Sequence, residues 1–274
     1  MKLHPQGIFP LMTISVLCML LWAGCVLRGE SQPTNQTPRQ SLNVFAAASL
    51  ADAFSEIARA FEGQHPGLEV VLNFAGSQQL AAQISQGAPA DVFASANHGQ
   101  MQRAITSGRI QAEAPTTFAR NHLVVVVPTR NPSRIYTLAD LSRSGLQLVI
   151  ADAVVPAGQY TRKFLTQAAS LHPDYSKLVL ANVVSFEQSV RAVLTKVQLA
   201  EADAGVVYES DLSKTSAVTP LYIPDSLNAT AMYPIAPLHN SPMDSLARVF
   251  VAFVQAPDGQ AILKRHGFKA PEEE

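Results

Sequence analysis

The segment from Leu42 to Phe61 constrains the fold of this 274-residue chain more than any other part. Its first part, 42–48, is a short apolar run that predicts a buried strand. It passes without a spacer into an amphipathic segment with apolar residues at helical spacing, among them Phe54 and Ile57. A strand that continues directly into a helix is the basic unit of α/β folds, so this segment predicts that fold class.

Ser49 lies at the junction between this strand and its helix. The first N–H groups of a helix have no intrahelical partner, and the helix dipole is positive there, so such a terminus can bind an anion. Ser49-Leu-Ala-Asp52 also resembles a capping box, in which Ser49 would only satisfy its own helix. From this segment alone both interpretations stay open.

The alternation of strand and helix continues along the chain. Apolar runs predict strands at 42–48, 68–74, 91–94, 122–128, 147–151, 178–184 and 204–208. Helical spacing predicts helices at 50–62, 77–86, 98–107, 159–169, 190–199 and 243–265. Near-continuous apolar strands of this kind predict buried, mostly parallel sheets. The length suits two modest domains, and chain crossings near 123–128 and 220–236 would make them a hinged pair.

Residues 1–25 predict a secretory leader that ends in Leu21-Trp-Ala-Gly-Cys25. This ending resembles a bacterial lipobox, in which Cys25 would become the lipidated first residue, although Trp22 stands where leucine is usual. A membrane span over 8–27 is the alternative, and the small residues before Cys25 favour cleavage. The polar residues that follow, through position 41, predict a flexible tether over 26–41.

Composition excludes several classes of function. The formal charge of −1 and the absence of a basic tract argue against nucleic acid as a partner. Both cysteines, Cys18 and Cys25, lie in the leader, so the body that follows has no disulfide, cysteine-metal site or cysteine nucleophile. Neither a nucleophile elbow, a P-loop, a dinucleotide fingerprint nor a zincin motif occurs, and we expect no enzyme. A hydrolase that uses Ser49 or Ser77 remains a remote alternative.

Further junctions repeat the one at Ser49. Ser77 opens a helix after Gly76, Ala157 and Val190 lie where two more helices begin, and Tyr208 ends a strand. In open α/β sheets ligands bind at the carboxyl edge of the strands, where these positions should meet. Hydroxyls and backbone N–H groups can satisfy a small oxyanion taken out of water without a counter-charge.

Seven motifs carry a resemblance to a known family: FAAASL (45–50), NFAGSQQLAAQI (73–84), GAPADVFASA (87–96), VPAG (155–158), SVRAVL (189–194), EADAGVVYESD (201–211) and HGF (266–268). In this order they resemble the molybdate-binding proteins of molybdate ABC transporters, which are type II periplasmic solute-binding proteins. The resemblance implies two lobes, each a mostly parallel sheet flanked by helices, with a hinge of two crossing segments. Lobe 1 would comprise 42–124 plus 232–274, and lobe 2 would comprise 125–231.

The resemblance also implies the site and the partners. The oxyanion would be bound by Ser49, Ser77, Ala157, Val190 and Tyr208, with Gly76 standing where some members have serine. The ligand would be molybdate or tungstate, with molybdenum present only as the oxyanion and with no cofactor and no catalysis. We expect a monomeric extracytoplasmic receptor, held at the membrane by lipid on Cys25, that delivers the anion to a membrane permease. Another oxyanion such as sulfate is the alternative; phosphate is disfavoured because none of the five residues offers a carboxylate to its proton.

Overall fold

The computed structural model describes residues 40–213 and 215–271. The expectations for the leader 1–25, for Cys25 and for most of the tether lie outside these residues. Residues 38–274 form one compact unit, so a protein that begins at residue 29 retains every described element. The first strand begins at Gln40, so the predicted tether is two residues too long. None of the described helices combines the length and the apolar character needed to cross a membrane.

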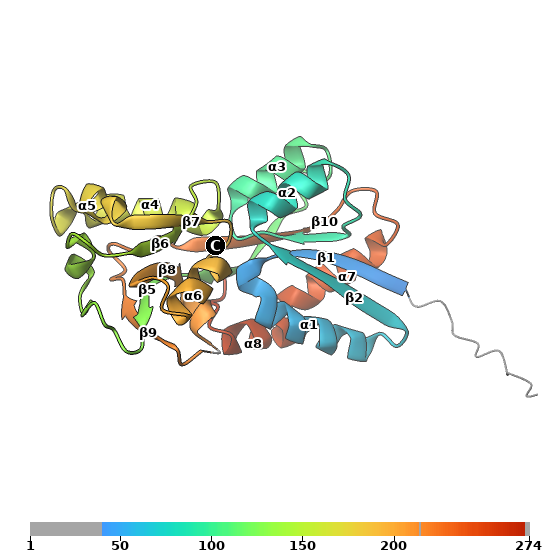
Figure 1. Cartoon of the computed structure of the whole chain (residues 1–274). Helices are drawn as coiled ribbons and strands as arrows, with labels where there is room; N and C mark the ends of the chain where they lie inside the picture. Colours follow the sequence, from blue (N-terminus) through green and yellow to red (C-terminus); the bar gives the residue numbers. More distant parts are fainter. Residues whose placement is uncertain (1–39, 214, 272–274) are drawn as a thin grey trace, which may run out of the picture. The chain divides into compact units, whose positions relative to one another are not determined.

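The first lobe is built on a five-stranded sheet with the order β2-β1-β3-β10-β4. Its strands are β1 (Gln40–Ala47), β2 (Leu68–Ala75), β3 (Val92–Ala94), β4 (Thr116–Asn121) and β10 (Ala231–Pro237). Its helices are α1 (Ala51–Gln64), α2 (Ser77–Ser85), α3 (His98–Thr106), α7 (Asp244–Gln255) and α8 (Pro257–Arg265). Figure 1 shows α1, α7 and α8 on one face of this sheet and α2 and α3 on the other.

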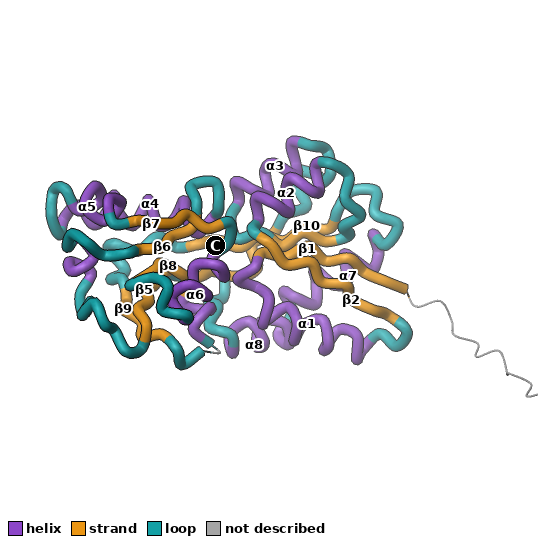
Figure 2. Tube along the Cα trace, in the orientation of Figure 1, coloured by secondary structure: helices purple, strands orange, loops and turns teal. Residues whose placement is uncertain are grey.

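The second lobe is built on a sheet with the order β7-β6-β8-β5-β9. Its strands are β5 (Leu123–Pro128), β6 (Leu148–Ala151), β7 (Val183–Glu187), β8 (Ala204–Tyr208) and β9 (Val218–Tyr222). Its helices are α4 (Pro156–Gln167), α5 (Tyr175–Ala181) and α6 (Val190–Gln198), with α4 and α5 on the opposite face from α6 (Figure 2). Short 3-10 turns add η1 (Ala48–Leu50), η2 (Leu138–Ser142), η3 (Ala168–Ser170) and η4 (Glu209–Leu212).

Both sheets are mixed, and each is mostly parallel as predicted, because four of its five strands run in one direction and a single strand is reversed. β1 pairs parallel with β2 and β3, while β10 pairs antiparallel with β3 and β4. In the second sheet β6 pairs parallel with β7 and β8, while β5 pairs antiparallel with β8 and β9. The reversed strands β5 and β10 are those that the chain enters directly after it passes from one lobe to the other.

The two crossing segments confirm the predicted two-lobed fold with a double hinge. One crossing is the single residue His122 between β4 and β5, and the other runs through 223–230 between β9 and β10. Asn228 joins them: its Oδ1 accepts from the Leu123 N–H at 3.1 Å and its Nδ2 donates to the Leu123 carbonyl at 2.9 Å.

Several predicted elements differ from the structure. The strand predicted over 178–184 is wrong, because Tyr175 and Val179 lie four residues apart on the buried face of a helix that extends to Ala181. The helix predicted over 243–265 is broken at Pro257, since proline disfavours helical geometry in the residue before it and cannot donate a backbone hydrogen bond. β4, β9 and β10 are not among the predicted strands.

The apolar core explains why both faces of the first sheet are covered. Phe45, Leu80, Ile84, Phe93 and Met101 pack between the sheet and the α2–α3 pair. On the other face, aromatic rings from α1 and α7 interlock, and Phe61 meets Phe250 edge to face at 5.1 Å. This packing fixes α1 and α2, and therefore the positions at which these helices begin.

Candidate anion-binding site

All five residues predicted for the site line one pocket between the lobes. Ser49 and Ser77 reach it from the first lobe, and Ala157, Val190 and Tyr208 reach it from the second. The pocket is small, with about 10 Å³ open to the centre of a water-sized sphere, and the rest of its lining consists of Ala47, Ala48, Gly76, Ala96, Val155, Pro156 and Ser189. Among the described residues that form this lining, none has a charged side chain.

Helix N-termini supply the backbone donors of the pocket. Ser77 and Val190 are the first residues of α2 and α6, and Ala157 is the second residue of α4. N–H groups at these positions have no intrahelical acceptor. Pro156 has no N–H, so that of Ala157 is the first donor of α4. The Ser189 hydroxyl accepts from the Ala192 N–H at 3.3 Å and caps α6, which leaves the Val190 N–H to the pocket.

Two glycines allow the backbone to approach closely around the pocket. A Cβ at Gly158 would lie 1.9 Å from the carbonyl oxygen of Asp152, so α4 can begin this close to β6 only without a side chain there. A Cβ at Gly76 would lie 2.4 Å from the carbonyl oxygen of Gln188 in the second lobe. Gly76 therefore leaves room for a close contact between the lobes.

The two serine hydroxyls are held by groups that their own helices do not supply. The Ser49 hydroxyl lies 3.0 Å from that of Tyr233 on β10, and neither N-cap position of η1 and α1 makes a side-chain capping bond. The capping-box interpretation of Ser49 is therefore wrong. The Ser77 oxygen accepts from the Ala96 N–H at 3.0 Å, so its own proton is free to be donated into the pocket.

Tyr208 brings a hydroxyl that makes no hydrogen bond of normal geometry with any described residue. Its side chain is buried, and its ring packs edge to face on that of Tyr233, with the ring centres 5.9 Å apart. Burial raises the pKa of Tyr208 well above its usual value, so the phenol stays a neutral donor. A buried donor without an acceptor is costly, and an anion in the pocket would supply that acceptor.

An ion-pair cluster lies behind the neutral lining. The Arg191 Nη2 donates to the Asp52 Oδ2 at 2.6 Å, and its Nε lies 3.0 Å from the Asp211 Oδ1. The Asp211 Oδ2 in turn accepts from the backbone N–H of Tyr208 at 3.0 Å. Burial raises the pKa of Asp211 to about 6, against the lowering effect of the Arg191 charge. Local sequence patterns do not reveal this cluster, because 139 residues separate Asp52 from Arg191.

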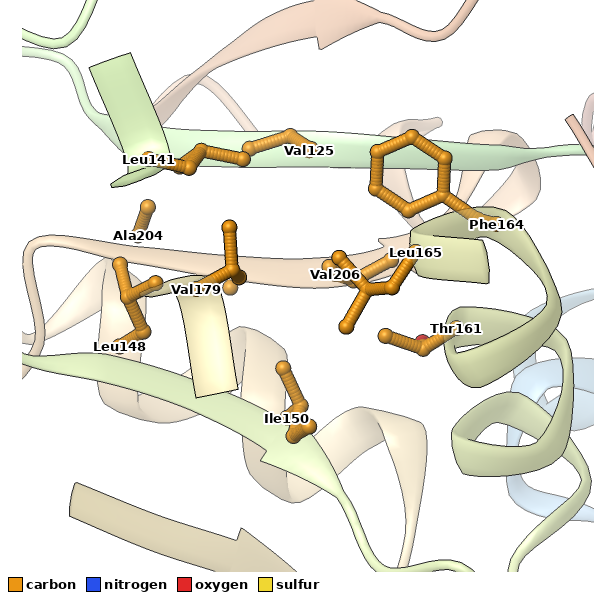
Figure 3. A pocket seen from close by; sticks show the side chains of 11 residues that line it. Val125, Leu141, Leu148, Ile150, Thr161, Phe164, Leu165, Val179, Ala204 and Val206 are labelled. Atoms are coloured by element: carbon orange, nitrogen blue, oxygen red, sulfur yellow. The ribbon is translucent and has the colours of Figure 1, made fainter. Parts of the chain in front are cut away.

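A second pocket, with only about 10 Å³ open to the centre of a water-sized sphere, lies within the second lobe (Figure 3). Apolar side chains line it, including Val125, Ile150 and Phe164. The one hydroxyl in this lining, that of Thr161, donates to the Ala157 carbonyl at 2.8 Å. This space offers no polar group to a ligand. In the described part of the chain, no three histidine, cysteine or acidic side chains are grouped so that they could hold a metal ion.

Comparison with known proteins identifies the family of this chain. Residues 42–269 match the family described as bacterial extracellular solute-binding protein. The molybdate-binding protein ModA of Mycobacterium tuberculosis is 41% identical over 266 residues, which cover 95% of this chain and 98% of that protein. The protein of the same name from Escherichia coli is 32% identical over 257 residues, 90% of this chain and 96% of that protein.

Solved structures show the same fold. The periplasmic molybdate-binding protein of Azotobacter vinelandii matches with a TM-score of 0.73 at 22% identity, over 84% of this chain and 100% of that one. The sulfate-binding protein SubI of Mycobacterium tuberculosis matches with a TM-score of 0.76 at 17% identity, over 85% of this chain and 88% of that one. Two proteins with different anions in their names thus have this architecture, so the fold alone does not choose the ligand.

Proposed function

The chain belongs to the bacterial extracellular solute-binding proteins, and from this premise we propose that it captures molybdate or tungstate in the pocket between its lobes. One observation carries the proposal: five neutral donor positions from both lobes meet in one small pocket that has no charged side chain among its described lining residues. The names of the relatives at 41% and 32% identity support the choice of oxyanion.

The chemistry of the lining suits a tetrahedral dianion. Ser49, Ser77 and Tyr208 would donate through hydroxyls, and Ala157 and Val190 through backbone N–H groups at helix N-termini. Hydrogen bonds to a charged acceptor are about twice as strong as neutral ones, which offsets the cost of removing the ion from water. Because donors come from both lobes, the ligand binds the closed form better than the open form and shifts the hinge towards closure.

We further propose that the protein is a monomeric receptor without a cofactor and without catalytic activity. Lipid on Cys25 would hold it at the outer face of the membrane, where the tether lets the body reach an ABC permease. Ser49 and Ser77 belong to the elements of the first sheet, and the other three donors belong to those of the second, which supports this proposal. Opening at the hinge would then separate the two groups of donors and release the anion.

Calorimetric titration of residues 29–274 with molybdate, tungstate, sulfate and phosphate tests the ligand. We expect molybdate and tungstate to bind with a Kd below about 1 µM, which corresponds to about −8 kcal/mol, and sulfate and phosphate to give no heat. Tight sulfate binding would keep the anion pocket and overturn the choice of molybdate. Silence with all four anions would overturn the proposal.

The variant Ser49→Ala tests the pocket itself. Removing one donor to a buried anion should weaken molybdate binding by about 1–3 kcal/mol, or roughly 5- to 150-fold in Kd. Ser142→Ala is the matched control, because its exposed hydroxyl only donates to the Ala139 carbonyl of its own turn, at 2.8 Å. Equal affinities in the two variants would remove Ser49 from the site.

A further inference from the structure

Arg191 is the first-turn residue of α6 that faces the first lobe. Its guanidinium meets two carboxylates that belong to different lobes, Asp52 at the start of α1 and Asp211 after β8. The side chains of Arg191 and Asp52 are 30% and 28% exposed, whereas that of Asp211 is fully buried. One of the two contacts therefore lies inside the second lobe, and the other spans the gap between the lobes.

The position of Arg191 is unfavourable for its own helix. A cation in the first turn opposes the positive end of the helix dipole, where an acidic residue would be stabilising. Nor does Arg191 serve the pocket directly, because it is not among the lining residues and both of its carboxylate neighbours carry negative charge. The presence of Arg191 at this position is therefore best explained by its contacts with the two carboxylates, which lie on different lobes.

The cluster is connected to three of the five donor positions. Val190 directly precedes Arg191, Ser49 lies three residues before Asp52, and the Tyr208 N–H donates to Asp211. Opening of the lobes would leave the Arg191–Asp211 pair intact within the second lobe and would expose Asp52 to water. The Arg191–Asp52 bond thus exists in one form of the hinge and not in the other, which is what a contact needs in order to bias an equilibrium.

We propose that Arg191 is a positioning residue that latches the closed lobes together, with Asp211 as its anchor in the second lobe and Asp52 as its partner on the first. The latch acts on the dissociation of the ligand, because it stabilises the form in which the pocket is complete. It rests on the proposed function, since a latch is useful only to a receptor that opens and closes.

Three hydrogen bonds from uncharged side chains also join the two lobes. Gln78 donates to the Gln188 carbonyl at 2.8 Å, Asn97 to the Gln159 side chain at 2.9 Å, and Gln100 to the Val154 carbonyl at 3.1 Å. These contacts join α2 and α3 to the second lobe, whereas the arginine joins α1 to it. Loss of the latch should therefore loosen the α1 side and leave the pocket able to form.

The variant Asp52→Asn tests the latch, because it removes the charge that spans the lobes and leaves the Arg191–Asp211 pair in place. Dissociation of molybdate, measured by stopped flow, should become about five- to tenfold faster, while the association rate changes little. Asp52→Glu keeps the carboxylate and should restore slow dissociation. Glu187→Gln is the matched control, because Glu187 pairs with Lys196 at 2.5 Å within the second lobe.

A direct readout of closure separates a latch from an ordinary stabilising ion pair. The body has no cysteine, so spin labels at Arg59→Cys on α1 and Lys177→Cys on α5 would report the distance between α1 and the second lobe without background. In Asp52→Asn the distance distribution with saturating molybdate should shift towards the open form, and in Glu187→Gln it should not.

Unchanged distances and unchanged dissociation in Asp52→Asn would overturn the latch while leaving the anion receptor intact. A wild-type protein that binds none of the four oxyanions would instead overturn the proposed function. In that case the ligand-free distances decide the latch: an open shift in Asp52→Asn supports it, and identical distributions overturn it.

Discussion

Tyr208→Phe separates a residue that serves a ligand from one that serves the fold. The change removes a single oxygen from a side chain that is buried in the pocket wall. In the ligand-free protein that hydroxyl makes no hydrogen bond of normal geometry with any described residue, so its removal breaks no such bond there. The ring keeps its edge-to-face contact with Tyr233. We therefore expect the free energy of unfolding without ligand to change by less than about 1 kcal/mol, or to rise, since a buried unpaired hydroxyl is itself costly.

Molybdate binding should respond in the opposite direction. Loss of one donor to a buried anion costs about 1–3 kcal/mol, which raises the Kd roughly 5- to 150-fold. Denaturation of the ligand-free protein and calorimetric titration measure the two effects on the same sample. Burial keeps the pKa of Tyr208 far above neutral pH, so the loss of affinity should be the same across the neutral range.

Tyr175→Phe is the matched control in the same lobe. The Tyr175 side chain is also buried, and its hydroxyl donates to the Leu138 carbonyl at 2.6 Å. Its loss leaves that carbonyl unsatisfied and should lower stability by about 1–3 kcal/mol, with no change in affinity. If Tyr208→Phe destabilises the ligand-free protein as much as Tyr175→Phe and binds molybdate like the wild type, the assignment of the Tyr208 hydroxyl to the ligand is refuted.

Two further variants test the backbone and the electrostatics. Gly158→Ala should lower the free energy of unfolding by about 1–3 kcal/mol and weaken molybdate binding, because the added Cβ would clash with the Asp152 carbonyl. Gly63→Ala is the control: its added Cβ would have nothing within 4 Å, so thermal denaturation should show an unchanged or higher Tm. Hydrogen bonds from Arg265 and His266 lower the pKa of Glu56 to about 2, from 4.5. A carboxylate with a depressed pKa adds stability above its unfolded pKa and loses it as pH falls, so the Tm difference between wild type and Glu56→Gln should shrink from pH 5 to pH 2. A constant difference would contradict this role of Glu56.

Local patterns explain how much of the site the sequence could predict. Ser49, Ser77 and Tyr208 stand where a strand ends or a helix begins, and such positions can be read from a few neighbouring residues. Ala157 and Val190 have no polar side chain, so the helix starts indicated only their backbone N–H groups, and the family resemblance pointed to the same two positions. All five line one pocket, whereas their contacts with the anion stay a prediction.

Contacts between distant segments explain what the sequence could not predict. Tyr233 lies 184 residues from Ser49 in the sequence, and its hydroxyl hydrogen bonds with that of Ser49. This contact orients the Ser49 hydroxyl at the pocket, so that it does not cap its own helix. The short apolar run at 178–180 fits a strand or a helix equally well, and the burial of Tyr175 beside it decided for a helix. Local sequence patterns thus predicted the positions of the donors, and tertiary contacts determine how the Ser49 and Ser77 hydroxyls are oriented.

The way these hydroxyls are held bears on which anions the pocket can accept. The Ser77 oxygen already accepts from the Ala96 N–H, and when Tyr233 donates to Ser49 that oxygen is occupied as well. Each serine can then donate its proton into the pocket and has one of its two lone pairs already used, while the backbone N–H groups can only donate. A protonated anion would bring a donor into a pocket with few free acceptors and no carboxylate among its described lining residues, and a buried donor left unpaired costs about 1–3 kcal/mol. Fully deprotonated tetrahedral dianions avoid this cost, so the contacts of Tyr233 and Ala96 contribute to selectivity although the charge of the pocket does not.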